Sequence, residues 1–127
     1  MAELKNLKPT ESELEILQVL WQKGKATVRD VHEQLVVNRD IGYTTTLKLM
    51  QIMHEKGLVQ RDDSSRTHIY KAVTNKENTQ KFLLNKFIGN LFGGSSSQLV
   101  LQALGSQTVS HDELNQIQSL IDDLKKK

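Results

Sequence analysis

Residues 43–57 read YTTTLKLMQIMHEKG, a stretch with hydroxyl side chains at its start and a glycine at its end. Threonine is a poor helix former in mid-helix but suits a first turn, and glycine commonly stops a helix. The stretch therefore predicts a helix over residues 43–56. Its apolar side chains recur at helical spacing on one face, and the remaining faces are largely polar. The inward face holds Thr46, Leu49, Met50 and Met53, and the outward faces hold Tyr43, Thr44, Leu47, Lys48 and Gln51.

A β-hairpin is expected directly after this helix. Residues 58–61 (LVQR) have strand character, and residues 62–65 (DDSS) form a cluster of turn residues. Residues 66–73 (RTHIYKAV) are rich in side chains that favour strands and partly alternate in polarity. Together these segments predict two antiparallel strands joined by a polar tip.

Two shorter helices are expected before residue 43. Thr10-Glu11-Ser12-Glu13 is a capping box, in which a hydroxyl and a carboxylate cap each other's backbone amides, and it starts a helix over residues 11–23. A second box begins at Thr27 and starts a helix over residues 28–35. Helix, helix, helix, strand, turn, strand is the order of a winged helix-turn-helix. The fold class is therefore mainly α with a small β-hairpin.

The outward face of the third helix has the chemistry of a DNA-reading helix. A glutamine can bond adenine through two hydrogen bonds, a threonine can bond base edges, and an aliphatic side chain can contact a thymine methyl group. Basic and hydroxyl side chains on the hairpin can contact phosphates. Residues 1–73 are thus interpreted as a winged helix-turn-helix DNA-binding domain. The expected contacts are Tyr43, Thr44, Thr45, Thr46, Leu47, Lys48, Gln51, Arg61, Ser65, Arg66 and His68.

A purely structural interpretation of the same residues stays open. The three threonines can serve only as a helix start, and Lys48 and Gln51 can form a solvated face. Arg61 and Arg66 can pair with the two aspartates of the turn. The ordered set of elements, each with its own start and stop, favours the DNA-binding interpretation.

Residues 74–127 are expected to form a helical dimerisation region. A capping box at residues 74–77 precedes a helix over about 75–92, and a Gly/Ser break at 93–97 precedes a short helix that ends at Gly105. A further capping box at Ser110 starts the last helix. These amphipathic helices could fold back on the winged domain or pair with a second copy, and we expect the dimer. Its expected contacts are Leu84, Phe87, Ile88, Leu91, Leu99, Leu101, Leu114, Ile117, Ile121 and Leu124.

Composition limits the remaining function classes. The 127 residues include 17 basic and 15 acidic side chains and no cysteine, which excludes disulfides and cysteine nucleophiles. Neither a membrane span nor a signal peptide is expected, so the cytoplasm is the expected location. Ser110, His111 and Asp112 are adjacent on a helix start and cannot form a catalytic triad. We expect no enzyme activity, cofactor or metal site.

Local charge keeps a second function class open. Residues 1–73 hold 11 basic and 10 acidic side chains, so this half is nearly neutral. A winged-helix module that binds protein without specific DNA binding is therefore the alternative. Steep loss of DNA affinity with rising salt would distinguish the two, because a DNA binder displaces condensed counterions. A small ligand between the two regions is a third, weaker hypothesis, because no convergent polar cluster supports it.

The chain resembles the penicillinase-repressor (BlaI/MecI-type) family of bacterial winged-helix transcriptional regulators. The resemblance rests on short motifs that follow one another in order over about residues 10–124. These motifs are LEIL with LW (14–17 and 20–21), ATVRDV (26–31), YTT (43–45), HEKGLV (54–59), Tyr70 and LVL (99–101).

The resemblance implies a homodimeric repressor on a dyad operator, with the reading helix starting at Tyr43-Thr44 and including Thr46, Leu47 and Gln51. In β-lactam-responsive relatives, a membrane sensor-protease pathway leads to cleavage of the dimerisation region at an Asn-Phe bond. The matching bond here is Gln102-Ala103, which departs from that pattern. Ile52 likewise stands where many relatives have arginine. The copper-responsive branch carries C-terminal cysteines and is excluded. Whether proteolysis or a ligand ends repression stays open.

Overall fold

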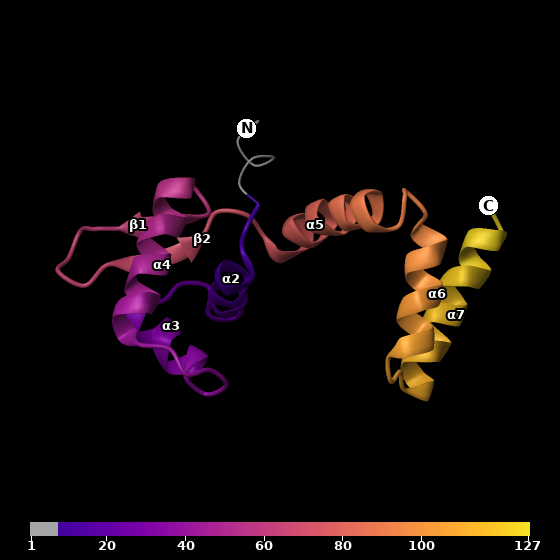
Figure 1. Ribbon diagram of the computed structural model, residues 1–127, viewed down its shortest axis with the longest axis horizontal. Coiled ribbons are helices and arrows are strands. Elements are labelled where there is room, and N and C mark those ends of the chain that lie inside the picture. The colour runs from indigo at the N-terminus through magenta and orange to yellow at the C-terminus, as the bar shows by residue number, and fades with distance from the viewer. Residues whose placement is uncertain (1–7) are drawn as a thin grey trace. The chain divides into compact units, whose positions relative to one another are not determined.

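The computed structural model describes residues 8–127, which form six helices and one two-stranded antiparallel sheet (Figure 1). The expected mainly helical fold with a small hairpin is confirmed. No helix in this described part is long and apolar enough to cross a membrane. Residues 1–7, to which the expectation about a signal peptide refers, lie outside it. The elements are α2 (Glu11–Lys23), α3 (Val28–Leu35), α4 (Tyr43–Lys56), β1 (Val59–Asp62), β2 (Ile69–Ala72), α5 (Lys76–Leu91), α6 (Ser96–Ser106) and α7 (His111–Lys125).

The first two helices begin where the capping boxes predict. At α2 the Thr10 hydroxyl accepts the Glu13 backbone N–H at 3.2 Å, and the Glu13 carboxylate accepts the Thr10 N–H at 2.9 Å. The same reciprocal pair joins Thr27 and Asp30 at α3. Since a cap satisfies amides that have no partner inside the helix, it fixes the helix start locally.

Backbone hydrogen bonds join the hairpin to the connection between two of the helices. Within the hairpin, Arg61 pairs with Tyr70 and Val59 with Ala72 in antiparallel register. Tyr70 also exchanges two backbone hydrogen bonds with Ala26, in the connection between α2 and α3, at 2.8 and 2.9 Å. The Tyr70 side chain is buried in the core. The sheet therefore has a short third member from the helical part of the fold, which the sequence analysis did not predict.

One apolar core joins α2, α3, α4 and the hairpin, and Figure 1 shows these elements together in the N-terminal part of the chain. Apolar burial is the main term that stabilises such a small unit. The core consists of Ile16, Leu17, Leu20, Ala26, Val28, Val31, Leu35, Met50, Met53, Leu58, Val59 and Tyr70.

Two ion pairs hold α2 to other parts of this unit. The Lys56 ammonium, at the end of α4, lies 2.8 and 3.0 Å from the two carboxylate oxygens of Glu13, whose residue is only 2% exposed. Arg39 pairs with Glu15, and both of these side chains are largely exposed. The first pair joins the start of α2 to the end of α4 through a buried carboxylate, whereas the second pair lies at the surface.

The chain divides into two compact units within α5, one ending at Leu83 and the other covering Leu84–Lys127. The sequence analysis placed the division after residue 73. The connection before α5 is attached to α2, because the Trp21 indole N–H donates to the Thr74 carbonyl at 2.9 Å. The Thr74 hydroxyl also bonds that of the buried Thr79 at 2.7 Å.

The predicted capping box at residues 74–77 is therefore wrong. The Thr74 hydroxyl bonds the Thr79 side chain, and the Asn75 side chain instead accepts the Asn78 backbone N–H at 2.8 Å. A local pattern could not show that a threonine near a helix start would be occupied by a residue one turn further along.

The second unit contains the end of α5 and the helices α6 and α7. Ser95 caps α6, and a complete capping box at Ser110 and Glu113 starts α7, as predicted. Gly105 does not end α6, which continues to Ser106. Neither α6 nor α7 has a fully buried residue, so their apolar side chains are covered only in part within this chain.

Candidate nucleic-acid interface

A groove of about 620 Å³ lies on the N-terminal unit between α3, α4 and the hairpin. Three elements that are separate in sequence contribute to it: the start of α3, the outer face of α4 and the end of the hairpin nearest the turn. Its lining residues are Thr27, Val28, Arg29, Tyr43, Leu47, Gln51, Arg66, Thr67, His68 and Tyr70. The structure thus brings Tyr43, Leu47 and Gln51 together with Arg66 and His68, all five of which the sequence analysis proposed as DNA contacts.

The outer face of α4 is open to solvent. Tyr43, Thr44, Thr45, Lys48 and Gln51 are exposed, and Leu47 is half-buried. No side chain caps α4, because Gly42 occupies the N-cap position. The first-turn amides of this helix therefore have no side-chain acceptor, and such amides favour anions such as phosphate.

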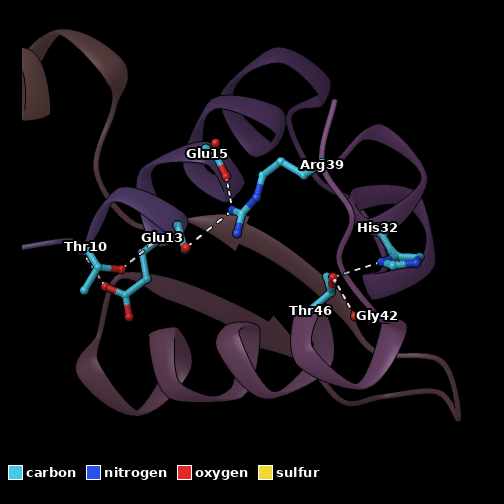
Figure 2. Close-up of polar contacts among 8 residues, drawn as sticks. Thr10, Glu13, Glu15, His32, Arg39, Gly42 and Thr46 are labelled. Atoms are coloured by element: carbon cyan, nitrogen blue, oxygen red, sulfur yellow. Dashed lines mark hydrogen bonds and ion pairs between the residues drawn. The ribbon is translucent and has the colours of Figure 1, made fainter. Parts of the chain in front are cut away.

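Thr46 does not lie on this face. Its side chain is fully buried, and its hydroxyl lies 2.9 Å from His32 Nδ1 on α3 and 3.5 Å from the Gly42 carbonyl (Figure 2). Helical spacing predicted this inward position, whereas Thr46 was also expected among the DNA contacts, both in the contact set of the helix and from the family resemblance. We leave Thr46 out of the contact set, because in this structure its side chain holds the start of α4 against α3.

Two aromatic rings and one guanidinium from α3 and α4 lie together beside the start of α4. The Arg29 guanidinium lies 5.9 Å from the centre of the Tyr43 ring, within the range of a cation–π contact. The edge of the His32 ring meets Tyr43 at 5.4 Å between ring centres. Arg29 therefore stands beside the first residue of the outer face of α4, held in place by an aromatic side chain.

Arg29 lines the groove but was not among the contacts expected from the sequence. The sequence analysis noted the capping box that includes this position, but not that the start of the second helix would face the start of the third. The available signal was a basic residue in an exposed first turn, at which phosphate contacts are common in helix-turn-helix proteins.

The Asp63 carboxylate at the hairpin tip pairs with Arg61 and lies near His68. Arg61 Nε lies 2.7 Å from Asp63 Oδ1, and His68 Nδ1 lies 3.6 Å from the same oxygen. Hydrogen bonding to Tyr70 and then to Asp63 raises the pKa of Arg61, which therefore stays charged. Hydrogen bonds from Ser64 lower the pKa of the Asp62 carboxyl. The alternative in which Arg61 pairs with an aspartate of the turn is thus confirmed for Asp63.

The remaining hairpin contacts differ in position. Arg66 and His68 line the groove, whereas Arg61 and Ser65 are not among its lining residues. The Ser65 hydroxyl donates to the Thr67 carbonyl at 2.8 Å and so shapes the turn.

The residues proposed for dimerisation are mostly exposed in the single chain. Leu91 is 64% exposed, Leu101 is 67% exposed and Leu124 is 57% exposed, values that are high for leucine. Leu84, Phe87, Leu114 and Ile121 are also exposed, and Ile88, Leu99 and Ile117 are half-buried. Gln102 and Ala103, proposed as a cleavage site, are exposed in the middle of α6.

Comparison with known proteins gives a consistent family and fold. A family profile described as "Penicillinase repressor" matches residues 9–123. The methicillin resistance regulatory protein MecI of Staphylococcus aureus (strain N315) is 20% identical over 112 residues, which cover 88% of this chain and 91% of MecI. The transcriptional regulator BlaI of Mycobacterium tuberculosis (strain H37Rv) is 35% identical over 63 residues, which cover 49% of this chain and 46% of BlaI.

Solved structures of MarR from E. coli share the fold. Wild-type MarR in its apo form matches with a TM-score of 0.51 and 14% identity, over 96% of this chain and 82% of MarR. A MarR mutant complexed with operator DNA matches with a TM-score of 0.50 and 14% identity, over 96% of this chain and 79% of that chain. At this identity the match describes the winged-helix fold alone.

Proposed function

Because the chain belongs to the penicillinase repressor family, we propose that it is a transcriptional repressor that binds a dyad DNA operator as a homodimer. Its relatives include transcriptional regulators, which supports sequence-specific DNA binding as its activity. The finer parts of the proposal are the contact residues, the dimer, the symmetry of the operator and the way in which repression ends.

The groove between α3, α4 and the hairpin is the observation that carries the proposal. The outer face of α4 presents a glutamine, threonines, a lysine and a tyrosine on a helix whose start has no side-chain cap. Arg29 and Arg66 line the same groove from two other elements. A helix in the major groove flanked by two basic side chains combines base reading with phosphate contacts.

The dimer is proposed because the second unit leaves its apolar side chains uncovered. Phe87 on α5, Leu101 on α6 and Leu124 on α7 are each about half exposed or more. Several exposed large apolar side chains on one small unit usually mark an interaction surface. Since operators read by helix-turn-helix dimers are commonly two-fold symmetric, a second copy of this chain is the partner that fits.

We include proteolysis of α6 as the proposed way to end repression, prompted by a membrane sensor-protease pathway. The Gln102-Ala103 bond lies in an exposed helix without buried side chains, so local unwinding would disturb little packing. Mass spectrometry of the protein from induced cells tests this, because cleavage there yields fragments that end at Gln102 and begin at Ala103. Recovery of only intact protein after full induction would point to a ligand instead.

Selection of bound duplexes from a random pool by the full-length protein, at near-physiological salt, tests DNA reading and symmetry together. Enrichment of a site with two-fold symmetry is the expected result, and its half-site spacing gives the operator geometry. No enrichment by folded protein would favour the alternative of a protein-binding module.

Two variants then test the contacts. Gln51→Ala should weaken operator binding by about 1–3 kcal/mol while changing non-specific binding little, since it removes a base contact. Arg66→Ala should weaken both and reduce the salt dependence by about one charge per wing. Gln22→Ala and Lys23→Ala, exposed residues at the end of α2, are matched controls. Unchanged operator binding in both test variants would contradict the proposed placement.

A further inference from the structure

One carboxylate at the hairpin tip holds two basic side chains of the proposed DNA contact set. Asp63 Oδ1 lies 2.7 Å from Arg61 Nε and 3.6 Å from His68 Nδ1. The Asp63 side chain is 53% exposed, and that of Arg61 is only 24% exposed. The Asp63 side chain as a whole is therefore more exposed than that of Arg61.

Arg61 is held in place from its other side by the sheet. It lies in β1 opposite Tyr70, whose side chain is buried in the core. A guanidinium fixed in this way is suited to a bidentate oxyanion, and carboxylates and phosphates present it with similar geometry. The contact between Arg61 Nε and Asp63 Oδ1 therefore uses a donor that a DNA phosphate could also use.

We propose that Asp63 limits the DNA affinity of this protein, because its carboxylate pairs with Arg61 in the free protein and competes with the phosphates of the DNA backbone for that side chain. The inference rests on the proposed DNA-binding function. All the proposed DNA contacts favour binding, whereas Asp63 is a residue that opposes it. In the free protein, Arg66 is the hairpin arginine that lines the groove, and Arg61 is paired with Asp63.

The expected size of the effect follows from the exposure of the pair. Exposed ion pairs are weak, so removing the acid should raise the affinity by only about 1.4- to 5-fold for each wing. A dimer with both wings on one duplex should show the square of that factor. Each freed cation should also steepen the plot of log affinity against log salt by about 0.9.

The test is a double-mutant cycle on the full chain, with affinity for a duplex of scrambled sequence measured at about 50–200 mM salt. A pH of 8 keeps histidine charge small, so the result reports on Arg61. Asp63→Asn should tighten binding and steepen the salt dependence as stated. Arg61→Gln should weaken binding less than about twofold in the wild-type background and remove the gain in the Asp63→Asn background.

A matched control separates this contact from net charge. Asp123→Asn removes the same charge from an exposed position on α7, in the other unit, and should leave both affinity and salt dependence unchanged. An equal gain in the two aspartate variants would overturn the inference, as would a gain that survives Arg61→Gln or no gain at all. Failure of the wild-type protein to bind any duplex would instead overturn the proposed function.

Discussion

The two ion pairs of α2 allow a direct test of how burial sets the value of a charge pair. Glu13 is 2% exposed and is held by Lys56, whose side chain is 33% exposed. Removing one partner of a buried pair typically costs about 3–5 kcal/mol because the other charge is left without compensation. Exposed pairs contribute about 0–1 kcal/mol. Because solvent reaches Lys56 in part, we expect Lys56→Met to lower the free energy of unfolding by about 2–3 kcal/mol.

The assay is urea unfolding followed by circular dichroism at one fixed protein concentration, because a dimer makes apparent stability depend on concentration. The midpoint should fall with an unchanged slope, which indicates a change in stability alone. Thermal unfolding should show a fall in Tm of about 10–20 °C. Methionine keeps most of the length of lysine, so the loss reports mainly on charge.

Arg39→Met is the matched control. It breaks the exposed pair with Glu15, which lies on α2 like Glu13, and should cost less than about 1 kcal/mol. The double variant Glu13→Gln/Lys56→Met should be more stable than Lys56→Met alone. Its glutamine still accepts the Thr10 N–H and no longer buries a charge. Equal losses in Lys56→Met and Arg39→Met, or no recovery in the double variant, would refute the reasoning.

Three further predictions concern helix ends and the start of α5. Trp21→Phe should cost about 1 kcal/mol in urea unfolding, because the Thr74 carbonyl loses its indole donor. Gly24→Ala should cost about 1–3 kcal/mol in the same assay, because φ is 86° there and open space around the site leaves backbone strain as the only penalty. Hydrogen bonds from the Ser110 backbone and hydroxyl lower the pKa of Glu113 below its ordinary 4.5, so this carboxylate stabilises α7 fully above pH 4.5 and loses that effect as pH falls through the lower folded value. An NMR titration of Glu113 should show the depressed pKa, and Ser110→Ala should raise it.

The sequence predicted three helix starts correctly, and each depends on neighbours in the chain. Thr10, Thr27 and Ser110 each cap a helix through residues three positions away, and such patterns are visible in a window of four. The outer face of α4 followed from helical spacing alone. These successes share one cause, which is that the interacting groups are close in sequence.

The contacts that complete the candidate site join residues far apart in sequence, and local patterns do not specify them. His32 bonds Thr46, and Arg29 lies over Tyr43, because α3 packs against the first turn of α4. Glu13 was expected only as part of a capping box, yet it also receives Lys56 from a position 43 residues away. Tertiary packing decides which of several available polar partners a side chain takes.

The backbone bridge between Ala26 and Tyr70 has a consequence for inheritance. A two-stranded hairpin by itself is barely stable in water, and this one gains a third neighbour from a connection 44 positions earlier in the chain. Recombination that exchanged the hairpin alone would therefore also have to keep its backbone contact with the segment around Ala26. The segments around Ala26 and Tyr70 therefore have to change together. Mutations that alter the path of the hairpin are constrained by the connection that contains Ala26.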